Sequence, residues 1–149
     1  WVGPYDDEKL GFNKVAPYYY YPGFWEGGTC LHYVVNTEKF NALPLVEKAV
    51  LKTACAMSNV SIQAKYDAVN PAALKRLVAG GTKLRPFSTE ILEAAYKASN
   101  ELYAELSAKS DKFKKIHDSY MAFRNDEYLW WQVAEYGYDN FMVRQRSKG

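Results

Sequence analysis

The most constraining feature of the sequence is an aromatic block that ends in a single carboxylate. Between two prolines and a glycine pair, residues 16–28 place six aromatic side chains, Tyr18, Tyr19, Tyr20, Tyr21, Phe24 and Trp25, and Glu26 follows the last ring. An extended aromatic run is typical of a β-strand, and Pro22-Gly23 is typical of the turn that ends one. The pattern therefore predicts a strand over the tyrosines, with Glu26 just beyond its end.

Glu26 has two interpretations. A carboxylate shielded by aromatic rings costs several kcal/mol unless it is paired, hydrogen-bonded or bound to a metal. Lone carboxylates, however, are usually surface groups. Composition alone favours an ordinary solvated glutamate after a core strand, and a functional carboxylate with a partner is the alternative.

Length and charge limit the classes of protein. The 149 residues suffice for one domain or for one lobe of a larger protein. The chain opens on Trp1 without an initiator Met or a signal region, so we expect a processed chain or a fragment.

The charged residues of the chain do not form a nucleic-acid-binding pattern. Basic and acidic residues number 19 and 17 and alternate along the chain, which predicts no nucleic-acid binding. The basic stretch 109–115 contains Asp111 and predicts a solvated helix face. No apolar run has the length of a membrane span.

The cysteines and histidines form no recognisable site. Cys30, Cys55, His32 and His117 are far apart and lack the spacing of a zinc or redox motif. We expect them to be structural or incidental.

Helix and strand signals alternate in the first part of the chain. Residues 4–10 predict a short helix that ends at Gly11, and residues 31–35 predict a second strand. A short helix is expected after Asn36. A long amphipathic helix follows from Val46, and it is expected to end before Pro71.

The second part of the chain is mainly helical. Residues 72–78 predict a separate helix with Asn70 as its cap, and residues 83–87 predict a third strand at a sheet edge. Helices are expected after Ser88 and after Ser110 or Asp111. The last helix is apolar on several sides over residues 128–141, which predicts contact with another lobe or subunit. This order indicates an α/β fold that is rich in helices.

Long collinear blocks of the chain resemble the C-terminal part of solute-binding proteins of tripartite ATP-independent periplasmic (TRAP) transporters, in the branch that binds 2-oxo acids such as pyruvate. The blocks are Trp1-Val2-Gly3-Pro4-Tyr5-Asp6-Asp7 and residues 16–28, 36–44, 65–87 and 122–142. The resemblance implies that residues 1–149 are the C-terminal portion of a two-lobe, periplasmic binding protein-like α/β fold with a long C-terminal helix. Such a protein is not an enzyme.

The same resemblance implies a ligand and a site. The ligand is a small carboxylate bound with a metal cation, sodium in pyruvate binders and calcium in some lactate binders. Glu26 corresponds to the carboxylate that ligates the cation, and Trp1 to the residue whose main-chain carbonyl does so. Trp1, Trp25 and Glu26 would be the substrate-binding residues. Phe24 and Trp25 would exclude water and shape the apolar side of the pocket. Hard cations take oxygen ligands, which agrees with a carboxylate oxygen of Glu26 and a carbonyl oxygen of Trp1 as ligands.

The resemblance also implies partners and missing residues. The family's carboxylate-binding arginine, a glutamine and an acidic cation ligand correspond to positions before Trp1. The protein would be periplasmic, would deliver its ligand to TRAP membrane permease subunits, and would form a homodimer if the last helix is exchanged between subunits. The alternative is that this helix packs on its own protein.

Two other functions remain open. An aromatic-cleft hydrolase would use Glu26 as general acid/base, with Asp6, Asp7 or Glu8 as the second carboxylate. A purely structural or interaction domain would use the aromatic last helix as its docking surface.

Overall fold

The computed structural model describes residues 2–27 and 31–146, in two compact units that comprise residues 1–92 and 93–149. The first unit contains α1 (Pro4–Leu10), η1 (Phe12–Lys14), β1 (Tyr18–Tyr21), α2 (Thr37–Ala42), α3 (Leu45–Ala79) and β2 (Lys83–Pro86). Helix α4 (Thr89–Lys109) begins in that unit and continues into the second. The second unit continues with α5 (Asp111–Trp131), a π-helical turn η2 (Gln132–Tyr136) and α6 (Gly137–Arg146).

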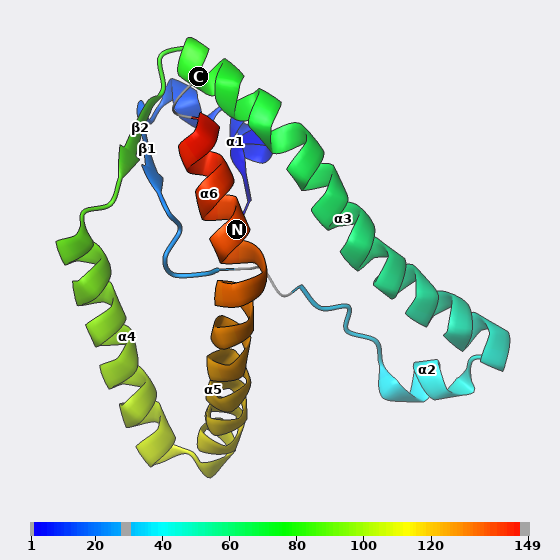
Figure 1. Cartoon of the computed structure of the whole chain (residues 1–149). Helices are drawn as coiled ribbons and strands as arrows, with labels where there is room; N and C mark the ends of the chain where they lie inside the picture. Colours follow the sequence, from blue (N-terminus) through cyan, green and yellow to red (C-terminus); the bar gives the residue numbers. More distant parts are fainter. Residues whose placement is uncertain (1, 28–30, 147–149) are drawn as a thin grey trace. The chain divides into compact units, whose positions relative to one another are not determined.

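The two strands pair in parallel, with Tyr18 opposite Lys83 and Tyr21 opposite Pro86. Parallel neighbours need a long crossover, and α2 and α3 lie in that connection (Figure 1). The turn from α3 into β2 has Gly81 at a φ of 99°, a left-handed conformation that favours glycine. Both strands occur where the sequence predicts them.

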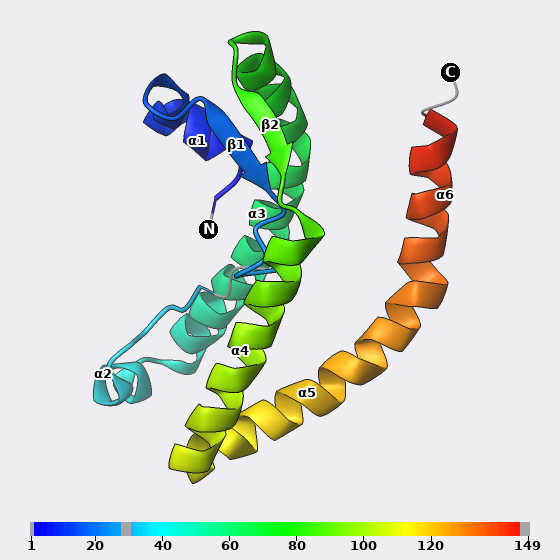
Figure 2. The same cartoon turned by 90° about the vertical axis from the view of Figure 1, so that its left-hand side faces the viewer.

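The core of the first unit lies where α1 packs against the C-terminal half of α3, close to the sheet (Figure 2). Within the described residues, Ala73 (0% exposed) and Leu77 (2%) are the buried apolar side chains. They are four residues apart and so share one face of α3. This face belongs to the part of α3 whose Asn70 and Arg76 contact α1.

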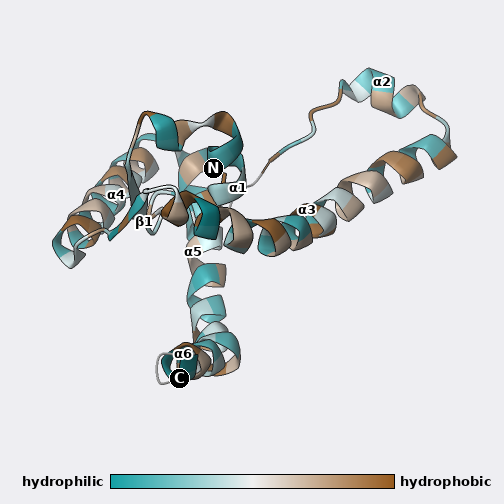
Figure 3. Ribbon diagram, turned by 90° about the horizontal axis from the view of Figure 1, so that it is seen from above, coloured by the Kyte–Doolittle hydropathy of each residue, from teal (hydrophilic) through white to brown (hydrophobic). Residues whose placement is uncertain are grey.

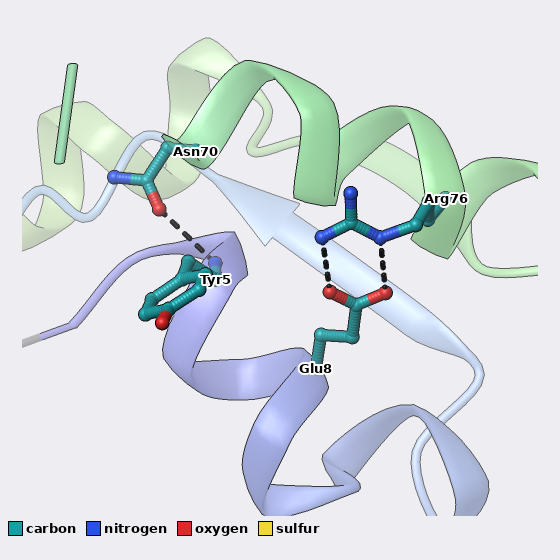
Figure 4. Close-up of polar contacts among 4 residues, drawn as sticks. All are labelled: Tyr5, Glu8, Asn70 and Arg76. Atoms are coloured by element: carbon teal, nitrogen blue, oxygen red, sulfur yellow. Dashed lines mark hydrogen bonds and ion pairs between the residues drawn. The ribbon is translucent and has the colours of Figure 1, made fainter. Parts of the chain in front are cut away.

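Two polar contacts join α1 to α3 (Figure 4). The amide of Tyr5 donates to Asn70 Oδ1 at 3.0 Å, so a side chain of α3 caps the first turn of α1. Arg76 Nε and Nη2 bind the two carboxylate oxygens of Glu8 at 2.8 and 2.6 Å. A Cβ at Gly3, the N-cap residue, would lie 2.6 Å from Asn70 Nδ2, so a larger residue here would displace the Asn70 side chain that binds the Tyr5 amide.

The Glu8–Arg76 pair makes the stability of the protein depend on pH. Hydrogen bonding to Arg76 lowers the pKa of Glu8 below its usual 4.5. A carboxyl group whose pKa is lower in the folded state stabilises that state above the unfolded pKa, and this contribution is lost as the pH falls through the folded pKa. We therefore expect Glu8→Gln to lower the melting temperature at pH 7 and to have a smaller effect below about pH 4. Thermal unfolding followed by circular dichroism checks this, and an equal effect at both pH values would contradict it.

Two predictions about regular structure are wrong. Residues 31–35 form no strand, and Val34 is 94% exposed. Their β-branched and aromatic side chains favour a strand, but the sheet in the described part of the chain contains only β1 and β2.

The predicted helix boundary at Pro71 is also wrong, because α3 runs without interruption through this residue. Proline removes one hydrogen bond of the helix. The buried Ala73 and Leu77 and the contacts of Asn70 and Arg76 with α1 hold the following turns in line with the preceding ones. Packing thus outweighs the local preference.

The long helix predicted from Val46 is present, but its apolar residues Val50, Met57 and Val60 are exposed. Figure 3 shows polar and apolar residues interleaved along this helix. Over residues 2–27 and 31–146, no helix has both the length and the apolar character needed to cross a membrane.

Helices α4 and α5 begin at the predicted caps. Ser88 Oγ accepts from the Ile91 amide at 3.3 Å, and Ser110 Oγ accepts from the Phe113 amide at 3.2 Å. His117 packs on Tyr103 and Phe113, with ring centroids 5.3 and 5.8 Å away. Lysines of the basic stretch bind carboxylates one turn away, in the pairs Lys109–Glu105 and Lys114–Asp118. These pairs agree with a solvated helix face.

Candidate functional site

A cavity of about 470 Å³ lies in the first unit, between the aromatic strand, α1 and the end of α3. Its volume falls in the range of small-molecule sites. Its lining comes from segments that are far apart in the chain, namely Val2, Asp7, Phe12, Asn13, Ala16, Tyr18, Tyr19, Tyr20, Tyr21, Gly23, Trp25, Glu26, Leu77 and Thr82.

The turn after β1 brings Trp25 and Glu26 to this cavity. The Glu26 amide donates to the carbonyl oxygen of Gly23 at 3.4 Å, which closes the turn. Phe87, just beyond β2, packs on one ring of β1 and on the two rings within the turn, with centroid distances of 5.2 Å to Tyr20, 5.2 Å to Phe24 and 6.3 Å to Trp25. Phe87 therefore anchors the turn against the sheet, and Glu26 is half-buried at its end.

A second carboxylate lines the same cavity. The Tyr19 hydroxyl donates to Asp7 Oδ2 at 2.6 Å and so joins β1 to α1. Burial raises the pKa of Tyr19, and the hydrogen bond to Asp7 raises it further. The phenol consequently stays protonated and remains a hydrogen-bond donor at neutral pH.

The charge of the cavity wall is negative. Asp7 and Glu26 line it, and none of its described lining residues is Lys, Arg or His. The Glu26 carboxylate, tyrosine hydroxyls, the Thr82 hydroxyl and the Asn13 amide belong to lining residues, and oxygen donors of these kinds fit a hard cation such as sodium or calcium. In the part of the chain that the structure describes, His, Cys, Asp and Glu side chains do not gather in threes or more as in a metal centre. The described lining thus offers oxygen donors without a cluster of three or more such side chains.

The site residues expected from the sequence fall in different places. Trp25 and Glu26 both line the cavity, and Trp25 is 64% exposed. Trp1 lies outside the described residues, as does Cys30. Cys55 is a half-buried free thiol on α3, away from the residues that line the cavity.

Sequence reasoning missed the Asp7–Tyr19 pair and the anchoring role of Phe87. Asp7 is one of three consecutive acidic residues and is readily explained as a charge in the first turn of a helix. No spacing in the sequence connects it with one particular tyrosine out of four. The pairing is visible only once α1 and β1 are in place.

Comparisons with known proteins agree on the class. The sequence model of bacterial extracellular solute-binding proteins, family 7 (DctP), matches residues 1–110. A monocarboxylate 2-oxoacid-binding periplasmic protein of Nostoc sp. (strain PCC 7120) is 48% identical over 141 residues, which cover 95% of this chain and 39% of the relative.

A solved structure is similar over nearly the whole chain. A TRAP transporter solute-binding protein from Bordetella bronchiseptica RB50 matches with a TM-score of 0.91 and 44% identity, over 99% of this chain and 44% of the relative. That structure is described as a mixed-occupancy dimer, with copurified calcium and picolinate in a bound active site compared with an apo site. The match confirms the predicted helix-rich α/β fold of a binding-protein portion, and the chain spans less than half the length of either relative. With the family model covering most of its length, the chain belongs to the DctP family of TRAP transporter solute-binding proteins.

Proposed function

We propose that this chain is part of an extracytoplasmic binding protein that captures a small monocarboxylate, a 2-oxo acid such as pyruvate, together with a metal cation. The observation that carries the proposal is the half-buried Glu26 at the wall of a cavity whose described lining has no cationic side chain. An anionic ligand next to such a wall needs a positive charge, which a bound cation would supply. The Nostoc relative, named as a 2-oxoacid-binding protein, supports this class of ligand.

We assign roles to three residues within this proposal. Glu26 ligates the cation through its carboxylate, and Trp1 ligates it through its main-chain carbonyl. The side chains of Trp1 and Trp25 lie against the ligand, and Trp25 excludes water from it. Sodium is the proposed cation. Calcium is the alternative, with lactate as one candidate ligand, and the calcium in the Bordetella structure supports a cation in this class of site.

The proposal extends to the whole protein. Residues 1–149 form the C-terminal portion of a two-lobe periplasmic protein, whose remaining part supplies further ligand contacts and which delivers the ligand to TRAP permease subunits. The exposed aromatic side chains of α5 and α6, among them Phe123, Trp130 and Phe141, favour a homodimer that buries them. The dimeric Bordetella relative supports this assembly.

Calorimetric titration of the full-length protein with pyruvate tests the function. We expect binding heat in sodium or calcium chloride, and weaker binding in potassium chloride of equal ionic strength. Lactate is titrated in parallel with calcium, because it is the alternative ligand. Absence of binding to either acid under every condition would overturn the proposal.

A further inference from the structure

The Asp7 carboxylate has no role in the cation site proposed above, yet it lines the same cavity as Glu26. Its position is held from two sides. Tyr19 donates to it from β1, and α1, which carries it, is tied to α3 through Asn70 and Arg76. A negative charge is therefore fixed on the cavity wall.

A fixed negative charge distinguishes between ligands that differ in charge. A monocarboxylate brings one negative charge, which the cation beside Glu26 offsets. A dicarboxylate brings a second negative charge into a cavity whose described wall contains no Lys, Arg or His side chain and already contains Asp7. Like charges in a partly desolvated site repel each other strongly, because the effective dielectric constant is well below that of water.

We propose that Asp7 is a specificity-determining residue that excludes ligands with a second carboxylate. The inference rests on the proposed function, because it requires that a carboxylate ligand binds in this cavity. It deepens that function by naming the residue that restricts the site to monocarboxylates. Specificity here comes from repulsion of the wrong ligand and not from an added contact with the right one.

Two probes of equal chain length test the proposal on the full-length protein. They are 2-oxopentanoate, which ends in a methyl group, and 2-oxoglutarate, which ends in a second carboxylate. We expect the wild-type protein to prefer 2-oxopentanoate, and Asp7→Asn to reduce that preference about tenfold or more, as expected for removal of one nearby charge. Asparagine keeps an oxygen that accepts the Tyr19 hydrogen bond, so the wall remains in place.

Two matched variants separate the effect of the Asp7 charge from an effect of Asp7 on the structure of the cavity wall. Tyr19→Phe removes the hydrogen bond but keeps the Asp7 charge; because Tyr19 also lines the cavity, we expect the affinities for the two probes to change together and their ratio to stay that of the wild-type protein. Glu8→Gln removes one negative charge from the next position of α1, where the carboxylate faces Arg76 and does not line the cavity. We expect that variant also to retain the preference, because the Tyr5–Asn70 and Tyr19–Asp7 contacts still hold α1 in place. A Tyr19→Phe variant that behaves like Asp7→Asn would show a structural role and overturn the proposal.

The remaining outcomes are also decisive. If neither probe nor pyruvate binds to the wild-type protein, the proposed function fails and the specificity of the site fails with it. If 2-oxopentanoate binds and Asp7→Asn leaves the preference unchanged, only the role of Asp7 is overturned. Should Asp7→Asn not fold, the wild-type preference is measured at rising potassium chloride with the cation held constant. If repulsion by Asp7 causes the preference, screening by salt should bring the affinities for 2-oxopentanoate and 2-oxoglutarate closer together. An unchanged ratio of the two affinities would contradict the proposal.

Discussion

Replacing Glu26 with glutamine should weaken the binding of a 2-oxo acid about a hundredfold and make the remaining binding insensitive to sodium and calcium. Glutamine has the same size and keeps one oxygen ligand, but it lacks the charge that holds a hard cation. The half-buried position of Glu26 at the cavity wall makes this loss larger than it would be on an open surface. Calorimetric titration with pyruvate at several cation concentrations measures both effects.

Glu38→Gln is the matched control, because Glu38 is an exposed carboxylate on α2 that does not line the cavity. It should bind pyruvate like the wild-type protein. Unchanged cation dependence in Glu26→Gln would remove Glu26 from the cation site. The hydrolase alternative is checked with the same variant, since it requires that the wild-type protein cleaves a glycoside and that Glu26→Gln does not.

Truncation of Leu77 to alanine should lower the free energy of unfolding by about 2–5 kcal/mol. Leu77 is 2% exposed and lies one turn from the fully buried Ala73, at the place where α1 packs on α3. The described core is small, so the neighbouring side chains cannot readily close the space that is left. Urea denaturation followed by circular dichroism gives the change.

Leu45→Ala provides the comparison on the same helix, because Leu45 is 83% exposed. We expect its effect to be within about 0.5 kcal/mol. Similar losses in the two variants would show that Leu77 is not the centre of this core. Since Leu77 also lines the cavity, Leu77→Ala is expected to weaken pyruvate binding in addition.

The sequence predicted the elements whose ends carry local signals. Ser88 and Ser110 cap α4 and α5 through hydrogen bonds to the amide three residues further along the chain. Gly11 ends α1 in a left-handed conformation. The failures have non-local causes. Residues 31–35 have strand propensity but no partner in the described sheet, and Pro71 stays within α3 because α1 packs across that part of the helix.

The residues of the candidate site also fall into those that local sequence signals identify and those that depend on contacts between distant segments. Glu26 and Trp25 are recognisable because they follow the aromatic strand directly, and the turn that displays them closes between Gly23 and Glu26. Asp7 and Phe87 reach the same region only through the packing of α1 and the pairing of β1 with β2. Their roles in the site therefore depend on contacts between segments that the sequence pattern does not connect.

The parallel pairing of Tyr18 with Lys83 also bears on the order of folding. The Tyr5–Asn70 and Glu8–Arg76 contacts are similarly long, with sequence separations of 65 and 68 residues. Helices form in about a microsecond, whereas contacts across such separations must first close a long loop. We therefore expect the cavity to form late in folding, and its wall includes residues near both ends of these long separations. The cost of loop closure rises only slowly with length, so the segment between the two strands can lengthen while the cavity wall is kept.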